Sequence, residues 1–170
     1  FPKDVKAFYA TAEKEGVNLS IVNAVNISNN QRPHTIVSKI TKYYNNNLKN
    51  VTLSILGLSF KPNTDDIRDS TSLIIARELL KKGAIIKVFD PQAMINAKIE
   101  IKDLFFCNNA YDTCVQSKGL IIATEWNEFR ALDLSKIKSL LSKPVIFDLR
   151  NIYDSNEVLK LGIEYIGIGI

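Results

Sequence analysis

Apolar side chains recur at helical spacing through the first part of the chain. One such series runs up to Gly16 and predicts an amphipathic helix that this glycine ends. A second series between residues 21 and 40 predicts a longer helix, with a kink or restart around Pro33 because proline lacks the amide hydrogen that a helix interior needs. The asparagine-rich segment 45–50 is typical of a surface turn or linker.

From Val51 onward, short apolar runs alternate with amphipathic segments. The run VTLSILGLSF (51–60) is almost continuously apolar, as expected of a strand that is covered on both faces. Further strands are predicted at 84–89, 104–107, 120–124, 145–149 and 165–168. Helices are predicted at 73–83, where Ser70 to Ser72 can provide the cap, and at 110–117, 134–141 and 156–161. This alternation predicts an α/β fold with a doubly wound, mostly parallel sheet, preceded by the helical segment.

Composition and charge narrow the class of protein. Of the 170 residues, 46% are apolar and 24% are charged, as in an ordinary globular domain with its own core. The net charge of +4 comes from lysines scattered among acids, so a nucleic acid is not the favoured partner. The apolar runs are far too short to cross a membrane, and no basic-apolar leader opens the sequence. We therefore expect a cytoplasmic protein without a membrane partner.

The cysteines and the histidine show no metal-binding spacing. Cys107 and Cys114 form neither a C-x-x-C pair nor a cluster with His34, the only histidine. We therefore expect no structural zinc, and two buried thiols in a reducing cytosol.

Polar and aromatic residues follow several of the predicted strands directly. In doubly wound sheets, ligands bind beyond the carboxyl ends of the strands. The residues at those ends are Phe60–Lys61, Asp90–Pro91, Thr124–Trp126 and Asp148–Arg150, which together supply two cations, three acids and two aromatic rings. This set predicts a site for an anionic ligand that contains a ring.

The loop SFKPNTDDIRDS (59–70) stands where a dinucleotide-binding protein would have the glycines of G-x-G-x-x-G. Lys61 can direct an ammonium group at a phosphate, and Arg68 can bind one as a bidentate fork. The three aspartates of the loop can orient those cations or lie at the positive end of the next helix. The competing interpretation, to which we give equal weight for any one residue, is a solvated loop with a capping aspartate.

Arg150 is another cation that directly follows a predicted strand, the one at 145–149. We favour a ligand contact over a surface arginine paired with Asp148 or Asp154. In the tract TEWNEFR (124–130), packing is the favoured role of Trp126 and Phe129, although both rings could stack on a ligand.

Three long stretches carry a resemblance: LGLSFKPNTDDIRDSTSLIIARELLKKGAIIKVFDP, ATEWNEFRALDL and VIFDLRNIYD. They resemble the carboxy-terminal domain of the UDP-glucose/GDP-mannose dehydrogenase family, and FPKDVKAF resembles the segment that follows that family's catalytic cysteine. TEWNEFR and DLRNIYD are more similar to the branch that oxidises UDP-glucose at C6. The resemblance implies two hydride transfers to NAD, with a cysteine that captures the aldehyde as a thiohemiacetal and then forms a thioester.

The resemblance also assigns roles to single residues. Phe60 and Lys61 match the substrate-contacting pair after the first strand, and Arg150 matches an arginine that binds the UDP-sugar. Arg68 matches an arginine that reaches NAD, and Lys3 matches a lysine near the cofactor. These positions are expectations that the resemblance implies.

Asp4 matches an aspartate that assists proton movement or positions water near the catalytic cysteine. On the residues alone, Lys3 and Asp4 can equally be the first turn of a helix. The resemblance further implies a homodimer in which residues 1–46 belong to the helical part of the central dimerisation domain. Residues 47–170 would form the Rossmann-like domain that binds UDP-glucose.

Neither cysteine of this chain stands in the context of the nucleophile. We therefore expect a carboxy-terminal fragment that begins just after the catalytic cysteine and is inactive alone. Two alternatives stay open. One keeps the enzyme but changes its substrate to GDP-mannose or a UDP-N-acetylhexosamine, and the other is a nucleotide-sugar-binding module without catalysis.

Overall fold

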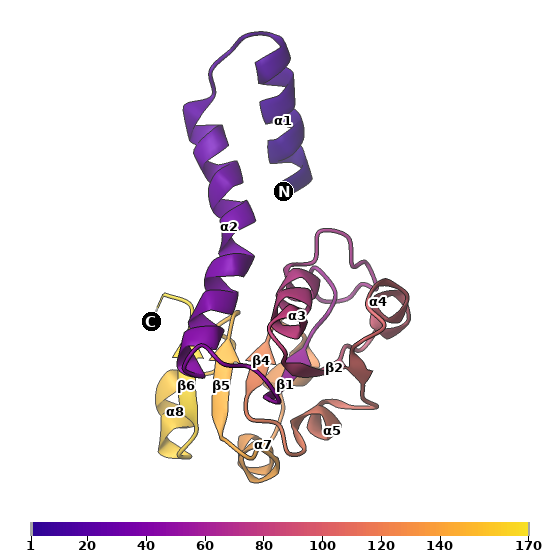
Figure 1. Ribbon diagram of the computed structural model, residues 1–170, viewed down its shortest axis with the longest axis vertical. Coiled ribbons are helices and arrows are strands. Elements are labelled where there is room, and N and C mark those ends of the chain that lie inside the picture. The colour runs from indigo at the N-terminus through magenta and orange to yellow at the C-terminus, as the bar shows by residue number, and fades with distance from the viewer. Residues whose placement is uncertain (1, 170) are drawn as a thin grey trace.

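An arm of two helices stands on an α/β unit in which helices cover both faces of a sheet (Figure 1). The computed structural model describes residues 2–169. The arm consists of α1 (Pro2–Lys14) and α2 (Ser20–Tyr43). The strands are β1 (Thr52–Leu56), β2 (Ile85–Phe89), β3 (Phe105–Phe106), β4 (Leu120–Ile122), β5 (Val145–Asp148) and β6 (Glu164–Gly167). The remaining helices are α3 (Thr71–Lys81), α4 (Met94–Glu100), α5 (Ala110–Cys114), α6 (Asn127–Arg130), α7 (Leu134–Leu140) and α8 (Ser155–Lys160).

The six strands form one sheet in the order β3-β2-β1-β4-β5-β6, and every neighbouring pair is parallel. This confirms the predicted doubly wound α/β fold. The chain builds one half of the sheet outward from β1 and then returns to build the other half outward from β4. The topological switch point therefore lies between β1 and β4, where such folds bind ligands.

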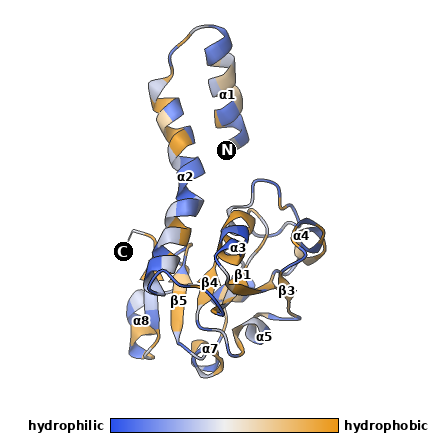
Figure 2. Ribbon diagram, viewed as in Figure 1, coloured by the Kyte–Doolittle hydropathy of each residue, from blue (hydrophilic) through white to orange (hydrophobic). Residues whose placement is uncertain are grey.

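Apolar side chains on both faces explain why the central strands are buried. Leu53, Ile55 and Leu56 of β1 are completely buried, and the strands are the most uniformly hydrophobic elements in Figure 2. One buried cluster lies under α2 and α3, and a second lies under α5, α7 and α8. Burying one such side chain contributes about 1.5–3 kcal/mol, so this two-sided burial accounts for much of the stability of the fold.

α2 continues through Pro33 as one helix. A proline inside a helix removes a backbone hydrogen bond, but Pro33 is itself buried here, together with Ile36, Val37 and Ile40 of the following turns. The three aliphatic residues belong to the same core cluster as Leu53 and Ile55 of β1. The carboxy-terminal half of α2 therefore packs on the sheet, whereas Ile21 in its first turns is exposed. The proposed domain boundary after residue 46 stays a prediction.

At the ends of α3, the predicted stop at Gly83 is confirmed, but Ser70 does not cap the helix through its side chain. Gly83 has φ +88° and follows the last turn, as expected of the residue after a helix C-cap. Ser70 occupies the N-cap position, but its hydroxyl donates to the carbonyl oxygen of Leu58 at 2.6 Å and makes no capping bond. That hydrogen bond ties the start of α3 to the loop after β1.

Several elements differ from the sequence prediction. β1 ends at Leu56, because the next residue, Gly57, has φ +95° and turns the chain. α4 was not predicted, and its apolar residues Ile95 and Ile99 are about three-quarters exposed. α6 was also not predicted, because four residues are too few to show a helical period.

Candidate functional site

The loops after β1 and β4 meet closely at the topological switch point. Gly57 packs against Thr124 so tightly that a Cβ atom on Gly57 would lie 2.4 Å from the Cβ of Thr124. The Thr124 hydroxyl donates to the carbonyl oxygen of Ser59 at 2.8 Å. These contacts fix the backbone from which Phe60 and Lys61 project.

Phe60 and Lys61 lie together on the surface, as the sequence predicted. Phe60 is 39% exposed, so part of its ring is accessible to a ligand. The Lys61 Nζ atom lies 5.2 Å from the centre of the Phe60 ring, so the ammonium group stays near the strand end. The pair offers a stacking surface beside a positive charge.

Asp90, at the end of β2, does not face a ligand. Its side chain is 1% exposed, and its Oδ2 atom accepts hydrogen bonds from the backbone N–H groups of Leu58 and Ser59 at 2.7 and 3.1 Å. The indole N–H of Trp126 donates to the same oxygen at 3.3 Å. Asp90 therefore organises the β1 loop, and Trp126 serves packing, as does the fully buried Phe129.

Asp148, at the end of β5, has a similar structural role. It is completely buried, and it accepts hydrogen bonds from the backbone N–H groups of Arg150 and Ile152 at 3.0 and 2.8 Å. The Tyr165 hydroxyl donates to it at 2.9 Å. Burial, and then the neighbouring Asp148 charge, raises the pKa of Tyr165, so this phenol stays protonated and remains a donor. The carboxylate thus shapes the turn from which the Arg150 side chain leaves the sheet.

The Arg150 side chain pairs with neither of the aspartates that the sequence suggested. Its Nε–H donates to the carbonyl oxygen of Ala123 at 2.9 Å, and the same Nε atom lies 2.9 Å from Oε2 of Glu125. Both partners follow β4, the strand beside β5. Arg150 therefore lies on the same edge of the sheet as Phe60 and Lys61, with the β4 loop between them.

Arg68 lies further along the loop after β1, where its partner Asp66 also accepts a backbone hydrogen bond from Phe60 at 3.1 Å. The Arg68 side chain is 87% exposed and binds Asp66 as a bidentate fork, with the Nε and Nη2 atoms 3.0 and 2.7 Å from the two carboxylate oxygens. These hydrogen bonds lower the pKa of Asp66 to about 2. This confirms that an acid of the loop orients a cation. Arg68 borders a hollow of about 330 Å³ that also touches Arg77 and Glu100.

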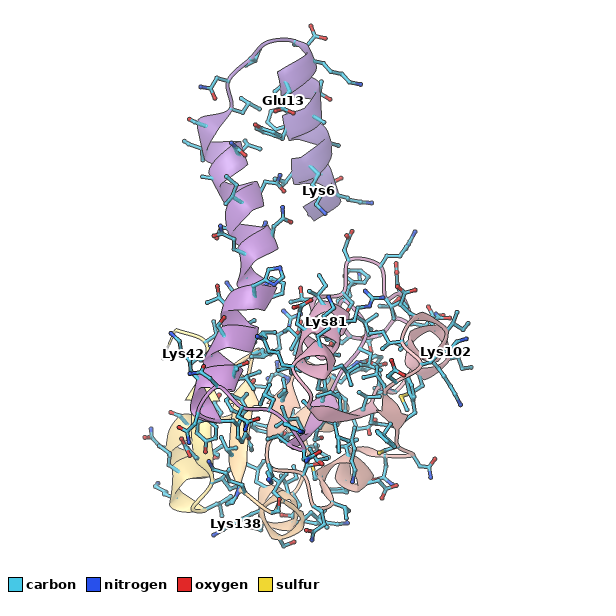
Figure 3. All side chains as sticks on the ribbon, in the orientation of Figure 1. Lys6, Glu13, Lys42, Lys81, Lys102 and Lys138 are labelled. Atoms are coloured by element: carbon cyan, nitrogen blue, oxygen red, sulfur yellow. The ribbon has the colours of Figure 1, made fainter. Side chains whose placement is uncertain are left out.

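The other two aspartates of the loop hold neighbouring elements. Asn96 of α4 donates to the backbone carbonyl and the carboxylate of Asp65 at 3.0 and 3.3 Å. The Oδ1 atom of Asp69 lies 3.7 Å from the Nζ atom of Lys6 in α1. The Lys6 label in Figure 3 marks the end of α1 that is nearest the α/β unit. Asn96 gave no signal in the sequence, because its partner is 31 residues away.

Lys3 and Asp4 are exposed on the first turns of α1. The ion pair between Lys6 and Asp69 joins this helix to the loop that contains Arg68. Phe1, with which the resemblance of FPKDVKAF begins, lies outside the described residues. The roles assigned to Lys3 and Asp4 stay predictions.

Burial sets the environment of the two thiols. Cys114 is buried and Cys107 is partly buried, and burial raises the pKa of both. Between residues 2 and 169, no three histidine, cysteine or acidic side chains come close enough to hold a metal ion. Over the same range, no helix is both long and apolar enough to cross a membrane.

Residues 54–155 match the model of the UDP-glucose/GDP-mannose dehydrogenase family, UDP binding domain. The UDP-glucose 6-dehydrogenases of Rickettsia conorii and Rhizobium meliloti are 39% and 37% identical to the chain over 99% of its length. The chain spans about 40% of the length of these curated relatives. The matched range contains Phe60, Lys61, Arg68 and Arg150.

Solved structures show the same fold. A UDP-glucose dehydrogenase from Pyrobaculum islandicum superposes with a TM-score of 0.84 and 33% identity, covering 98% of this chain and 36% of that one. A GDP-mannose dehydrogenase from Pseudomonas aeruginosa superposes with a TM-score of 0.77 over 99% of this chain and 38% of that one, at 21% identity. At that identity the second comparison supports the fold alone.

Proposed function

This chain belongs to the UDP-glucose/GDP-mannose dehydrogenase family, and from that premise we propose that it binds UDP-glucose at the carboxyl ends of β1, β4 and β5. In this proposal it is the carboxy-terminal part of an NAD-dependent UDP-glucose 6-dehydrogenase. The observation that carries this proposal is the match of residues 54–155 to a UDP-binding domain. Within that range, the exposed Phe60, Lys61 and Arg150 lie at the carboxyl edge of the sheet, in the loops after β1 and β5.

The charges at this edge suit a diphosphate. The Asp90 and Asp148 carboxylates are buried and hydrogen-bonded inside the fold, and the Glu125 carboxylate is paired with Arg150. Lys61 supplies a point charge, and Arg150 supplies a planar fork that can bind a phosphate through two donors. Phe60 offers its exposed face to a ring of the ligand. Together these groups would bind and orient the nucleotide part of the substrate.

NAD would be held mainly outside the loop after β1. A dinucleotide pyrophosphate needs a glycine-rich turn there, but Gly57 is packed against Thr124. When bound, NAD would accept the hydride from the sugar. We propose that the exposed Arg68, which borders a hollow of about 330 Å³, binds a phosphate of the cofactor, and that the exposed Lys3 lies near the cofactor.

Catalysis needs a thiolate that this chain does not supply in a suitable place. Cys107 and Cys114 have raised pKa values through burial, which is the opposite of what an attacking thiol requires. We propose that Asp4 acts on a proton or a water molecule beside a cysteine of the longer protein. The 170-residue chain should then produce no NADH from UDP-glucose and NAD, and steady NADH production by the pure chain would contradict this proposal.

We also place the protein in a cytoplasmic homodimer. Apolar side chains on α1, α2 and the turn between them support a second copy as partner, because several stay exposed: Phe8, Val17, Ile21, Val25 and Ile27. The two free thiols suit a reducing compartment. Sedimentation of the chain at micromolar concentration tests the dimer, and a monomer at all concentrations would oppose it.

Calorimetric titration of the chain with UDP, GDP and NAD tests the ligand assignment directly. We expect UDP to bind and GDP to bind at least tenfold more weakly. Binding of GDP without UDP would refute the assignment to UDP-glucose. Binding of neither nucleotide would refute nucleotide-sugar binding by this chain.

A further inference from the structure

The carboxylate of Glu125 has an incomplete environment. Its Oε2 atom is closed off from solvent, although a third of the side chain is exposed. Within residues 2–169 it is the buried side-chain oxygen that has no hydrogen-bond partner. An ionised carboxylate with an unsatisfied buried oxygen is unfavourable, so such an atom calls for a functional or electrostatic reason.

The cation beside that oxygen is Arg150. Its Nε atom lies 2.9 Å from Glu125 Oε2, which is well within ion-pair distance. The Nε–H bond, however, is directed at the Ala123 carbonyl oxygen, also at 2.9 Å. The contact with Glu125 is therefore a charge attraction without hydrogen-bond geometry, which explains how the same oxygen can be ion-paired and still lack a donor.

This arrangement holds the guanidinium group at one end only. Both contacts of its side chain use Nε, and the structure of residues 2–169 shows no hydrogen bond from its two terminal nitrogens to protein. Those nitrogens are the pair of donors that a phosphate engages in bidentate fashion. A negative charge at the Nε end would draw the side chain back onto the β4 loop and keep it from extending into solvent.

We propose that Glu125 is a positioning residue, which holds the Arg150 guanidinium by charge so that its terminal nitrogens face an anionic ligand at the switch point. This inference rests on the proposed function, in which Arg150 binds the phosphates of a UDP-sugar. Glu125 itself need not touch the ligand. Its effect on affinity should pass entirely through Arg150.

The test is a double-mutant cycle, with UDP affinity of the 170-residue chain measured by calorimetry. Arg150→Ala should lower UDP affinity by about 10- to 100-fold, the range for losing a charged hydrogen-bonding group. Glu125→Gln, which keeps the size and removes the charge, should lower it by about three- to tenfold. The double variant should bind no more weakly than Arg150→Ala alone, because a positioning residue has nothing left to position.

Two further variants separate positioning from a structural role. Glu125→Asp keeps the charge and should retain affinity within about threefold of the parent. Glu128→Gln, at an exposed position of α6, should change nothing. Thermal unfolding of each variant shows whether the fold is intact, and a folded Glu125→Gln chain with lowered affinity is the result that supports the inference.

Other results overturn it in distinguishable ways. If Arg150→Ala weakens binding and Glu125→Gln does not, the positioning role is wrong while the proposed function survives. Additive losses in the double variant would mean that Glu125 acts without Arg150. If the parent chain does not bind UDP, or Arg150→Ala leaves the affinity unchanged, the phosphate-binding role of Arg150 fails and the inference fails with it.

Discussion

Replacing Asp90 by asparagine tests whether this buried carboxylate holds the loop that presents Phe60 and Lys61. The two oxygens of Asp90 accept from two sets of backbone donors. One oxygen receives the N–H groups of Leu58 and Ser59, and the other receives the two N–H groups of the turn after β2, at 2.9 and 2.8 Å. An asparagine side chain has one carbonyl oxygen, so its NH₂ group must face one set of donors.

The loss of stability follows from the number of hydrogen bonds that asparagine cannot accept. Two hydrogen bonds to a charged acceptor are lost, each worth about 1.5–3 kcal/mol, and partial relaxation leaves an expected loss of about 3–5 kcal/mol in the free energy of unfolding. Because domains of this size are typically stable by about 5–15 kcal/mol, the variant should remain folded but marginal. Where the NH₂ group faces the N–H groups of Leu58 and Ser59, the loop after β1 also loses its anchor, and UDP affinity should fall together with stability.

Urea unfolding is a suitable assay, because Trp126 is the only tryptophan, is buried, and contacts Asp90 itself. The matched control is Asp133→Asn. Asp133 is an exposed N-cap that accepts from two backbone N–H groups of α7, and asparagine is an equally good N-cap residue, so the loss should be below about 0.5 kcal/mol. A loss below about 1 kcal/mol for Asp90→Asn, or one equal to the control, would refute the structural role of Asp90.

Three other outcomes follow from single contacts. Gly57→Ala should destabilise the chain by at least about 2 kcal/mol in thermal or urea unfolding, because φ is +95° and the new Cβ would meet Thr124; an unchanged midpoint would contradict that packing. Lys61→Ala should weaken UDP binding in calorimetry, whereas Arg68→Ala should not, and equal losses would place both cations on one ligand. In NMR titration the Asp66 carboxyl should show a pKa of about 2. Because the pKa of this carboxyl is lowered on folding, its contribution to the free energy of unfolding is present above pH 4 and is lost as the pH falls toward 2. A titration midpoint near pH 4 for Asp66 would mean that Arg68 is not bound to it in solution.

The class of fold could be predicted because it depends on local and periodic features. Continuous apolar runs, such as the one that contains Leu53 and Ile55, must be covered on both faces, and their alternation with amphipathic segments leaves a parallel sheet as the simple solution. The six parallel strands confirm this. α4 was not predicted, although Ile95 and Ile99 have helical spacing, and the structure leaves both of them exposed.

The place of the candidate site could also be predicted, since the carboxyl ends of parallel strands meet at one edge. Phe60, Lys61 and Arg150 do lie on that edge, and their roles stay predictions. Sequence reasoning placed Asp90 and Asp148 among the groups that face a ligand, but the structure buries both. The direction of a carboxylate depends on which backbone N–H groups lack acceptors in the folded turn, and no sequence pattern records that.

The sequence by itself determined the α/β class, the covered strands and the edge where charges gather, because burial and strand alternation are properties of neighbouring residues. Only the tertiary structure decided which charges are engaged and how. Arg150 is paired with Glu125, 25 positions earlier, instead of Asp148 or Asp154 nearby, because β4 and β5 run side by side about 4.8 Å apart. Electrostatic pairing follows distance in space, and strand order sets that distance.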